Sequence, residues 1–163
     1  DDEKIYLLSK EIENYFVSVY KQTMYTEFEL ELYNTKETSN LTSELLGGKL
    51  RKLYHKYYGK NVICDDISSV EWTRLGHIYR HAYYPYKYAT GLIIASIVTN
   101  NVSNGTLSKE NYLKFLSSGS SQYSLKLLKI LNIDLTDKDI IKNGFKVLEN
   151  DINELNKVLT LKR

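Results

Sequence analysis

The sequence has 163 residues, with 22 Lys and Arg against 20 Asp and Glu, which leaves a net charge of +2. That length suits one domain or one piece of a larger domain, and the near-balance of charge argues against a strongly basic nucleic-acid binder. A lone cysteine, Cys64, cannot form an internal disulfide or build a cysteine-rich zinc site, and it favours a reducing, cytoplasmic location. Only one Pro and 8 Gly are present, which argues against an all-β fold.

Two features of the sequence bear on location: the start of the chain and its longest apolar run. The chain opens on Asp1-Asp2-Glu3 without Met, which suggests a piece cut from something longer, and this charged opening lacks the apolar region of a signal peptide. The longest apolar run, residues 91–98, is far shorter than the roughly 20 residues that span a bilayer. We therefore expect neither nucleic acid nor a membrane as a partner.

Helical periodicity dominates the first third of the chain. Apolar residues at three- and four-residue steps predict one long helix over 4–33, with Thr23, Glu27 and Leu30 prolonging its stripe, and residues 34–39 break the pattern. A second helix is expected over 42–58, with Thr42 as N-cap and Gly59 as stop. Gly47-Gly48 inside it indicates close helix contact or a local break.

The middle of the chain is predicted to hold two further helices. Residues 60–67 suit a loop, and Ser68 followed three residues later by Glu71 fits a capping box for a short helix over 69–75, which Gly76 would end. Residues 77–88 gather five Tyr and two His, and Pro85 suits the first turn of a helix that starts near Tyr84 and runs to about residue 102.

Three helical segments complete the chain. They are expected over 109–117 after Ser108 as cap, over 122–131, and over 137–160 after Thr136 as cap. The predicted fold class is therefore all-α, with about six or seven helices in a single piece covering residues 1–163.

Most catalytic motifs are missing from the sequence. No His is followed by the Glu of an H-E-x-x-H zinc motif, and three His with one Cys cannot easily build another metal site, so no metal ligand is assigned to this chain. Cys64 lies beside Asp65-Asp66, which would raise its pKa, and we interpret it as a small buried hydrophobe.

The segment 77–88 is the remaining candidate for chemistry. Neutral phenols and an imidazole can donate hydrogen bonds to a developing oxyanion. Two plain readings compete with this: tyrosines at helical spacing that fill a core with the hydroxyl at its rim, and His77 as a hydrogen-bonded structural residue. His55 and His81 are expected at the surface.

Several blocks of this sequence resemble the oligoendopeptidase F family, which are zinc metallopeptidases related to thimet oligopeptidase. The residues 20–29, Y-K-Q-T-M-Y-T-E-F-E, are similar to the F-R-Q-T-M-F-A-E-F-E block of that family. Further similar blocks follow in the family's order: K-Y-Y-G at 56–59 with the Asp pair at 65–66, E-W-T-R-L-G-H at 71–77, Y-Y-P-Y-K-Y-A-T-G at 83–91, Y-L-K-F-L at 112–116, Gly119-Ser120, and 128–134. The resemblance covers the chain from about residue 17 to its C-terminus.

The resemblance implies a specific function. This chain would be the C-terminal part of the catalytic domain of a zinc-dependent oligoendopeptidase, with the zinc ligands and the catalytic Glu in the missing N-terminal part. The family's helical fold encloses a deep cleft that admits short peptides as substrates, and its His and Tyr face the zinc across that cleft. On this reading His77, Tyr84, Tyr86 and Tyr88 bind substrate and stabilise the tetrahedral intermediate. The chain alone would bind no zinc and would be inactive.

The sequence departs from the family pattern at a few positions. Gly76 stands where the family has Pro, and Pro85 and Lys87 stand where Val and Gln are common. The spacing between His77 and the tyrosines is one residue longer than the family pattern, which leaves open which Tyr donates to the oxyanion. Leu131-Asn132 replaces Ala-Gly, which we interpret as a change of turn.

Two other hypotheses fit the missing zinc motif. The chain could be a stand-alone helical interaction module without chemistry, in which the long amphipathic helices dock a partner. It could also belong to a degraded enzyme that has lost its zinc site.

Overall fold

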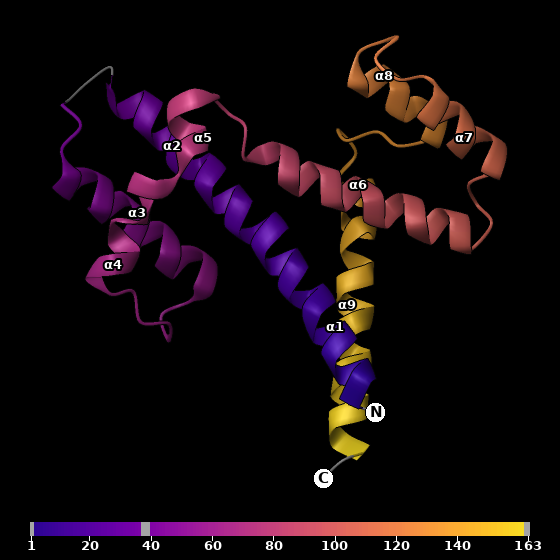
Figure 1. Ribbon diagram of the computed structural model, residues 1–163, viewed down its shortest axis with the longest axis horizontal. Coiled ribbons are helices and arrows are strands. Elements are labelled where there is room, and N and C mark those ends of the chain that lie inside the picture. Colours follow the sequence, from indigo (N-terminus) through magenta and orange to yellow (C-terminus); the bar gives the residue numbers. More distant parts are fainter. Residues whose placement is uncertain (1, 37–39, 162–163) are drawn as a thin grey trace. The chain divides into compact units, whose positions relative to one another are not determined.

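The structure, a computed structural model, describes residues 2–36 and 40–161, and within these ranges every regular element is a helix. The predicted all-α class is therefore confirmed. In chain order the elements are α1 (Asp2–Tyr15), η1 (Phe16–Lys21), α2 (Gln22–Lys36), α3 (Ser43–Tyr58), α4 (Asp66–Ser69), η2 (Glu71–Arg74), α5 (Gly76–Arg80), α6 (Tyr86–Ser103), α7 (Lys109–Ser117), α8 (Ser124–Leu128), η3 (Lys129–Leu131) and α9 (Lys138–Leu161) (Figure 1).

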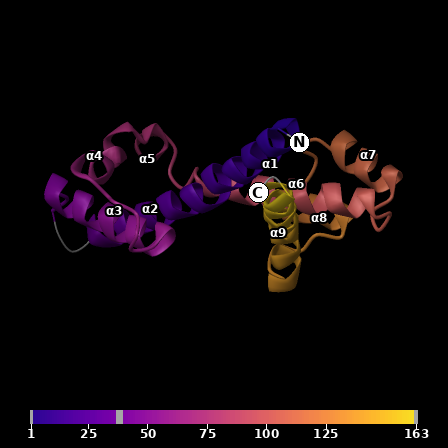
Figure 2. The ribbon, with the colours of Figure 1, turned by 90° about the horizontal axis from the view of Figure 1, so that it is seen from below.

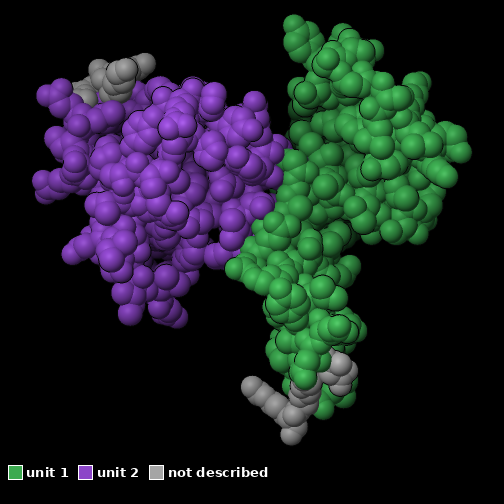
Figure 3. Space-filling model, in the orientation of Figure 1, with its two compact units in different colours: residues 1–15, 91–163 green, residues 16–90 purple. Residues whose placement is uncertain are grey.

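The chain forms two compact units, shown in Figure 3. Unit 1 comprises residues 1–15 and 91–163, and unit 2 comprises residues 16–90. The first boundary falls where α1 meets η1, and the second falls inside α6. No Gly-, Pro- or Ser-rich linker marks either boundary, so composition alone does not indicate the division.

Unit 1 is built on two long helices and a group of short ones. Helices α1 and α9 lie side by side (Figures 1 and 2), and Lys4 forms an ion pair with Glu154 between them. The buried side chains of its core cluster are aliphatic and come from α6, the loop before α7, α8, η3 and the loop after η3: Ile97, Leu107, Leu128, Leu131 and Ile133.

Tyr15 and Gly144 mark the tightest part of unit 1. The hydroxyl of Tyr15 is fully buried and donates to the Gly144 carbonyl oxygen at 2.9 Å, and it also contacts Ser96 Oγ. A Cβ built on Gly144 would lie 2.7 Å from Ile93 Cγ2 and 3.2 Å from the Ile93 carbonyl oxygen. Because a methyl group would not fit there, glycine allows α9 to approach α6 closely.

Unit 2 is built on the pairing of α2 with α3. Its buried core comes from these two helices and consists of Met24, Tyr25, Phe28, Leu46, Leu50 and Leu53. Ion pairs at the edge of the pair join Lys49 to Glu31 and Lys56 to Glu27. Gly47 lies against the backbone of α4, where an added Cβ would be 3.3 Å from the Ser69 carbonyl oxygen, whereas Gly48 faces open space. Close contact is thus the reason for Gly47.

The helix that opens the chain is not a uniform α-helix. Between α1 and α2 the segment η1 is π-helical, in which hydrogen bonds run from residue i to i+5 and one turn holds more residues. The buried positions Val19 and Met24 are five residues apart, in keeping with this wider turn. As a result the buried face of α2 passes through Tyr25, Phe28 and Glu29, and the predicted stripe through Thr23, Glu27 and Leu30 is wrong.

Several predicted helix ends are confirmed by their caps. The Thr42 hydroxyl accepts from the Leu45 amide at 3.2 Å, and the Ser108 hydroxyl accepts from the Asn111 amide at 3.2 Å. Gly59 follows α3 with φ of 81°, a backbone conformation that favours glycine. Residues 37–39, part of the predicted break, lie outside the described residues, and α2 continues to Lys36.

Two predicted caps are wrong, because in each case an Asp side chain accepts from an amide at the start of the helix instead. Asp65 accepts from the Ser68 amide at 2.7 Å, so α4 begins at Asp66 and the Ser68–Glu71 capping box does not form. Asp137 accepts from the Asp139 amide at 2.8 Å, while Thr136 bonds to Asp134 instead of capping α9.

Gly76, expected to end a helix, begins α5. Asn132 stands where the family pattern has Gly, and its backbone conformation explains why Asn fits there. Asn132 follows η3 with φ of 57°, a left-handed conformation that Asn tolerates better than other non-glycine residues. It can therefore replace the Gly of the family pattern at this turn.

Among the described residues, no helix combines the length and the apolar character that crossing a bilayer requires.

Candidate active-site segment

The predicted site residues lie in unit 2, on α5 and on the first turns of α6. His77 is on α5, Tyr84 comes just before α6, and Tyr86 and Tyr88 open it. Between the two helices the chain turns at residues 81–85, where the Tyr84 amide donates to the His81 carbonyl oxygen at 3.2 Å. Pro85 is buried, and its carbonyl oxygen accepts from the Tyr88 amide at 3.1 Å, so the helical turn starts at this proline as expected.

Three of the four predicted residues form what we call the His/Tyr cluster: His77, Tyr84 and Tyr88. The rings of His77 and Tyr84 are stacked, with centroids 5.2 Å apart and an interplanar angle of 5°. The hydroxyl of Tyr88 lies 3.2 Å from His77 Nε2, within hydrogen-bond distance, and the direction of that bond depends on the imidazole tautomer. Tyr84 and Tyr88 are in edge-to-face contact at 5.5 Å.

The helical period explains this selection. Tyr84 and Tyr88 are four residues apart, so they lie on one face of the turn that leads into α6. Tyr86, two residues from each, is directed elsewhere and is 45% exposed. It lies outside the His/Tyr cluster but remains open to solvent.

The cluster has a polar, partly open surrounding. His77 and Tyr84 are half-buried and Tyr88 is exposed, so a ligand can reach their polar atoms. Lys87 places its ammonium 4.9 Å from the centroid of the Tyr84 ring. His81 is exposed, as predicted, with its ring 5.9 Å from that of Tyr84, and His55 is exposed on α3. Chemically the cluster offers an imidazole and phenol hydroxyls that can donate hydrogen bonds at a surface.

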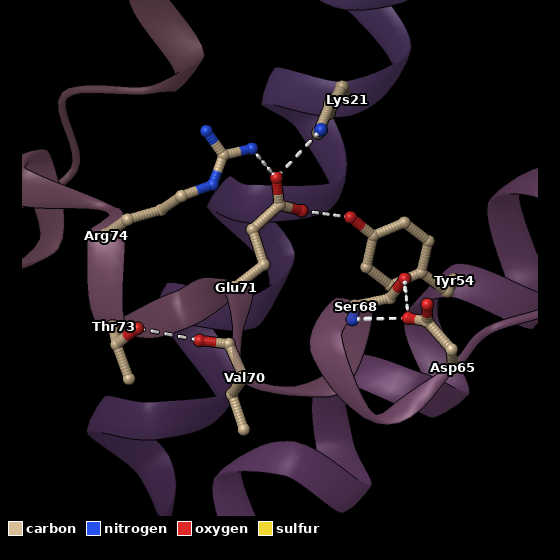
Figure 4. A network of polar contacts seen from close by, with 8 residues as sticks. All are labelled: Lys21, Tyr54, Asp65, Ser68, Val70, Glu71, Thr73 and Arg74. Atoms are coloured by element: carbon tan, nitrogen blue, oxygen red, sulfur yellow. Dashed lines mark hydrogen bonds and ion pairs between the residues drawn. The ribbon is translucent and has the colours of Figure 1, made fainter.

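A second polar feature of unit 2 centres on Glu71, whose side chain is only 8% exposed. Its carboxylate accepts from Lys21 at 3.0 Å and also from Arg74 and Tyr54 (Figure 4). These contacts join η1, α3 and η2, and burial together with the Arg74 charge lowers the pKa of Lys21. The adjoining cavity has a volume of about 490 Å³.

The Glu71 network differs from the interpretation of this residue as half of a capping box. The partner that decides its orientation, Lys21, is 50 positions away in the sequence, so no local pattern signals the contact. Since both carboxylate oxygens are already bonded to the chain, we assign Glu71 a role in holding unit 2 together.

Glu29 is the residue that sequence reasoning missed. It is fully buried on α2, and its Oε1 accepts from the Tyr83 amide at 2.7 Å. The one available signal was its place beside Phe28 and one turn after Tyr25, on a face that the expected α-helical register turned toward solvent.

The described residues offer neither metal-ligand geometry nor a reactive thiol. No group of three His, Cys, Asp or Glu side chains among them could hold a metal ion, so this part of the chain does not fit a zinc centre. Cys64 is half-buried, and its pKa is raised chiefly by burial, with Asp65 adding to the effect and Arg51 opposing it. A raised pKa means little thiolate at neutral pH, which does not suit a nucleophile.

Comparisons with known proteins agree on one family. The sequence pattern of Peptidase family M3 matches residues 1–147. The chain is 35% identical to oligopeptidase PepF of Bacillus subtilis (strain 168) over 164 residues, which cover 98% of this chain and 24% of the relative. It is 33% identical to an oligoendopeptidase F homolog of Borreliella burgdorferi, covering 97% of this chain and 27% of that one.

Structural similarity leads to the same family. The crystal structure of oligoendopeptidase F from Enterococcus faecium matches 96% of this chain with a TM-score of 0.88 at 31% identity, and the match covers 30% of that structure. The chain thus spans about a quarter of the length of the curated relatives it matches. On the family pattern, the relatives and the fold together, the chain belongs to peptidase family M3.

Proposed function

We propose that the protein carrying this chain is a zinc-dependent oligoendopeptidase that hydrolyses short peptides, and that the chain forms the C-terminal helical part of its catalytic domain. The observation that carries the proposal is the match of nearly the whole chain to about a quarter of the length of proteins named oligopeptidase or oligoendopeptidase. The His/Tyr cluster supports it, because a peptidase needs hydrogen-bond donors where the carbonyl oxygen becomes negative.

We assign substrate binding and oxyanion stabilisation to His77, Tyr84, Tyr86 and Tyr88. The Tyr88 hydroxyl lies 3.2 Å from His77 Nε2, within hydrogen-bond distance. In the tautomer whose Nε2–H donates to the Tyr88 oxygen, the hydroxyl proton of Tyr88 is free to donate to a carbonyl oxygen placed beside it. Tyr84 covers the imidazole face and fixes the plane of the ring. Tyr86 is exposed at the start of α6 and extends the donor surface along the substrate.

The metal of such an enzyme would have to be held elsewhere. Because the described residues contain no metal-ligand group, we place the zinc ligands in a part of the protein outside this chain. The chain by itself is then expected to hydrolyse nothing. The peptide-binding donors and the metal site would meet only when both parts are present.

The first test is the length of the protein in its source cells, measured with an antibody raised against this chain. A band far above the mass of 163 residues supports the proposal, and the upstream part can be examined for zinc ligands. A band at the mass of the chain itself contradicts it and favours the stand-alone interaction module.

The second test separates the tyrosines in the protein at its natural length. We expect at least one of Tyr84→Phe, Tyr86→Phe and Tyr88→Phe to lower kcat for a short peptide by about 10²–10³-fold, because removing one oxyanion donor has that effect. Tyr123→Phe, an exposed tyrosine of unit 1, is the matched control. If kcat falls no further in any of the three variants than in the control, the assigned role is wrong.

A further inference from the structure

Glu29 is an unusual residue to find at the centre of unit 2. Its side chain is fully buried on α2, on the helix that also carries the core residues Met24 and Phe28, and it is bonded to the segment 77–88. One carboxylate oxygen, Oε1, accepts a single hydrogen bond, from the Tyr83 amide at 2.7 Å. The other, Oε2, is buried and has no hydrogen-bond partner among the residues that the structure describes.

Such a carboxylate does not serve the stability of the core. Burying a polar group without its full set of hydrogen bonds disfavours folding, and an apolar side chain of the same size would fill the space without that cost. The contact that remains is the bond to the backbone of Tyr83. The reason for a buried Glu29 therefore lies in its effect on Tyr83.

Tyr83 has a backbone conformation that a tyrosine rarely adopts, with φ of 56°. Left-handed conformations at non-glycine residues are disfavoured and persist only where the surroundings impose them. Two contacts from α2 do so here: the Glu29 carboxylate on the Tyr83 amide, and the ring of Tyr33, whose centroid lies 5.1 Å from that of Tyr83.

The turn at Tyr83 decides where the His/Tyr cluster lies. Tyr84 follows it directly and stacks on His77, and Pro85 then starts the helical turn that carries Tyr88. If residue 83 relaxed to an ordinary conformation, the direction of the chain into Tyr84 would change and the ring stack on His77 would be lost.

We propose that Glu29 is a positioning residue, which holds the turn at Tyr83 and thereby sets the geometry of the His/Tyr cluster. It acts through the backbone and touches no substrate. Its effect on catalysis rests on the proposed function, whereas its effect on the cluster can be measured in the full 163-residue chain without any activity.

The structural test compares Glu29→Gln, which keeps an acceptor oxygen for the Tyr83 amide, with Glu29→Leu, which removes it. The probes are the NMR resonances of the His77 ring protons, which sense the stacked ring of Tyr84, and the exchange rate of the Tyr83 amide. We expect Glu29→Leu to move the His77 resonances and to abolish protection at Tyr83, and Glu29→Gln to keep both near the wild type. Glu31→Leu, two residues further along α2 at an ion pair of the surface, is the matched control.

Two outcomes overturn the proposal. One is a Glu29→Leu chain that is folded but shifts His77 no more than Glu31→Leu does. The other concerns the wild type and so does not depend on whether the leucine variant folds: if the Tyr83 amide exchanges as fast as amides in unstructured peptides, the bond does not hold the turn. Protection of roughly 10²-fold or more is expected, because the amide is bonded inside a folded unit.

The catalytic test uses the protein at its natural length. Displacing a catalytic group by about 1 Å can lower the rate on the order of 10²-fold, so we expect Glu29→Leu to lower kcat by that factor with little change in KM, and Glu29→Gln to restore most of it. If the tyrosine variants leave kcat unchanged, the oxyanion role assigned to the tyrosines is wrong, while the NMR result still decides on Glu29. If a tyrosine variant lowers kcat but folded Glu29→Leu does not, the positioning role is wrong.

Discussion

Unit 1 and unit 2 are stabilised by different kinds of buried side chain. All tyrosines except Tyr6, Tyr15, Tyr112 and Tyr123 lie in unit 2, together with Trp72, Cys64 and the three histidines. The core cluster of unit 1 is aliphatic, with the buried Tyr15 as the exception outside it, and the unit depends on a close helix approach at Gly144. At the edge of the core of unit 2 lie tyrosines whose hydroxyls donate hydrogen bonds to carboxylates.

This difference has a consequence for the electrostatics of unit 2. Burial raises the pKa of Tyr57 to about 12, and its hydroxyl donates to Glu27 Oε2 at 2.9 Å. Burial likewise raises the pKa of Tyr54, which donates to Glu71. These phenols stay protonated at neutral pH and serve as fixed donors. Unit 2, where the candidate site lies, is therefore ordered by directed polar contacts in addition to apolar burial.

One carboxyl group from each unit shows opposite effects of a partner and of burial. In unit 2 the hydrogen bond from Lys56 holds the pKa of Glu27 below its ordinary value of 4.5. In unit 1 burial, with a smaller effect from Glu11, raises the pKa of Asp151 above its ordinary value of 3.8, and Asp151 Oδ2 has no partner among the described residues. The first group stabilises its unit when ionised, and the second destabilises it.

The largest effect is expected from a deletion in the apolar core of unit 2. Leu50 is fully buried, so Leu50→Ala should lower the free energy of unfolding by about 2–5 kcal/mol. Trp72 lies in unit 2, so its fluorescence reports the unfolding of that unit, while circular dichroism follows helices of both. Leu30→Ala, at an exposed leucine of the same unit, is the control. An equal loss in the two variants would show that Leu50 does not anchor this core.

A slightly smaller effect is expected at the Glu71 network. Glu71→Leu leaves the half-buried ammonium of Lys21 and the hydroxyl of Tyr54 without their partner, and we expect a loss of about 3 kcal/mol in denaturant unfolding. The comparison is Lys142→Ala in unit 1, which breaks an exposed ion pair to Asp139 and should cost less than about 1 kcal/mol. If both variants lose the same amount, the burial of the network adds nothing and the contrast between the units is wrong.

The close helix approach in unit 1 can be tested at a single glycine. Gly144→Ala would force a methyl group against Ile93, and we expect it to destabilise unit 1 by about 1–2 kcal/mol. Gly48→Ala provides the opposite case in unit 2, because it lies in a helix facing open space and should gain roughly 0.5–1 kcal/mol. Thermal unfolding of the two variants therefore shifts in opposite directions. A gain for Gly144→Ala would mean that α9 and α6 are not in close contact.

The smallest effect concerns pH. The cost of ionised Asp151 is present at neutral pH and disappears as the pH falls through its raised pKa toward 3.8, so Asp151→Asn should raise the melting temperature at pH 7 and have no effect below pH 3.8. A gain of at most about 1 kcal/mol corresponds to roughly 2–4 °C. Glu27→Gln should do the reverse, since the stabilisation by Glu27 is complete above pH 4.5 and is lost as the pH falls through its lowered pKa. Parallel shifts in the two variants would contradict this contrast.

Local signals in the sequence were sufficient for the fold class and for many helix ends. Thr42, Ser108 and Gly59 act as caps through contacts within one helical turn, so their neighbours in the sequence decide their role. The motif blocks were sufficient for the family, because matching residues in a fixed order do not depend on how the helices are arranged. They also brought His77 and the tyrosines of segment 77–88 into consideration.

Tertiary structure alone decided the rest. The π-helical turn of η1 rotated the buried face of α2 and placed Glu29 inside, which no regular period predicts. Tyr84 and Tyr88 gathered on His77 while Tyr86 did not, since the start of α6 fixes which face the tyrosines share. The Glu71 carboxylate accepts from Lys21, which is 50 positions away in the sequence, and the Glu29 carboxylate accepts from the Tyr83 amide, which is 54 positions away. Such contacts depend on how the helices meet, and helix-forming patterns of three or four residues carry no information about that.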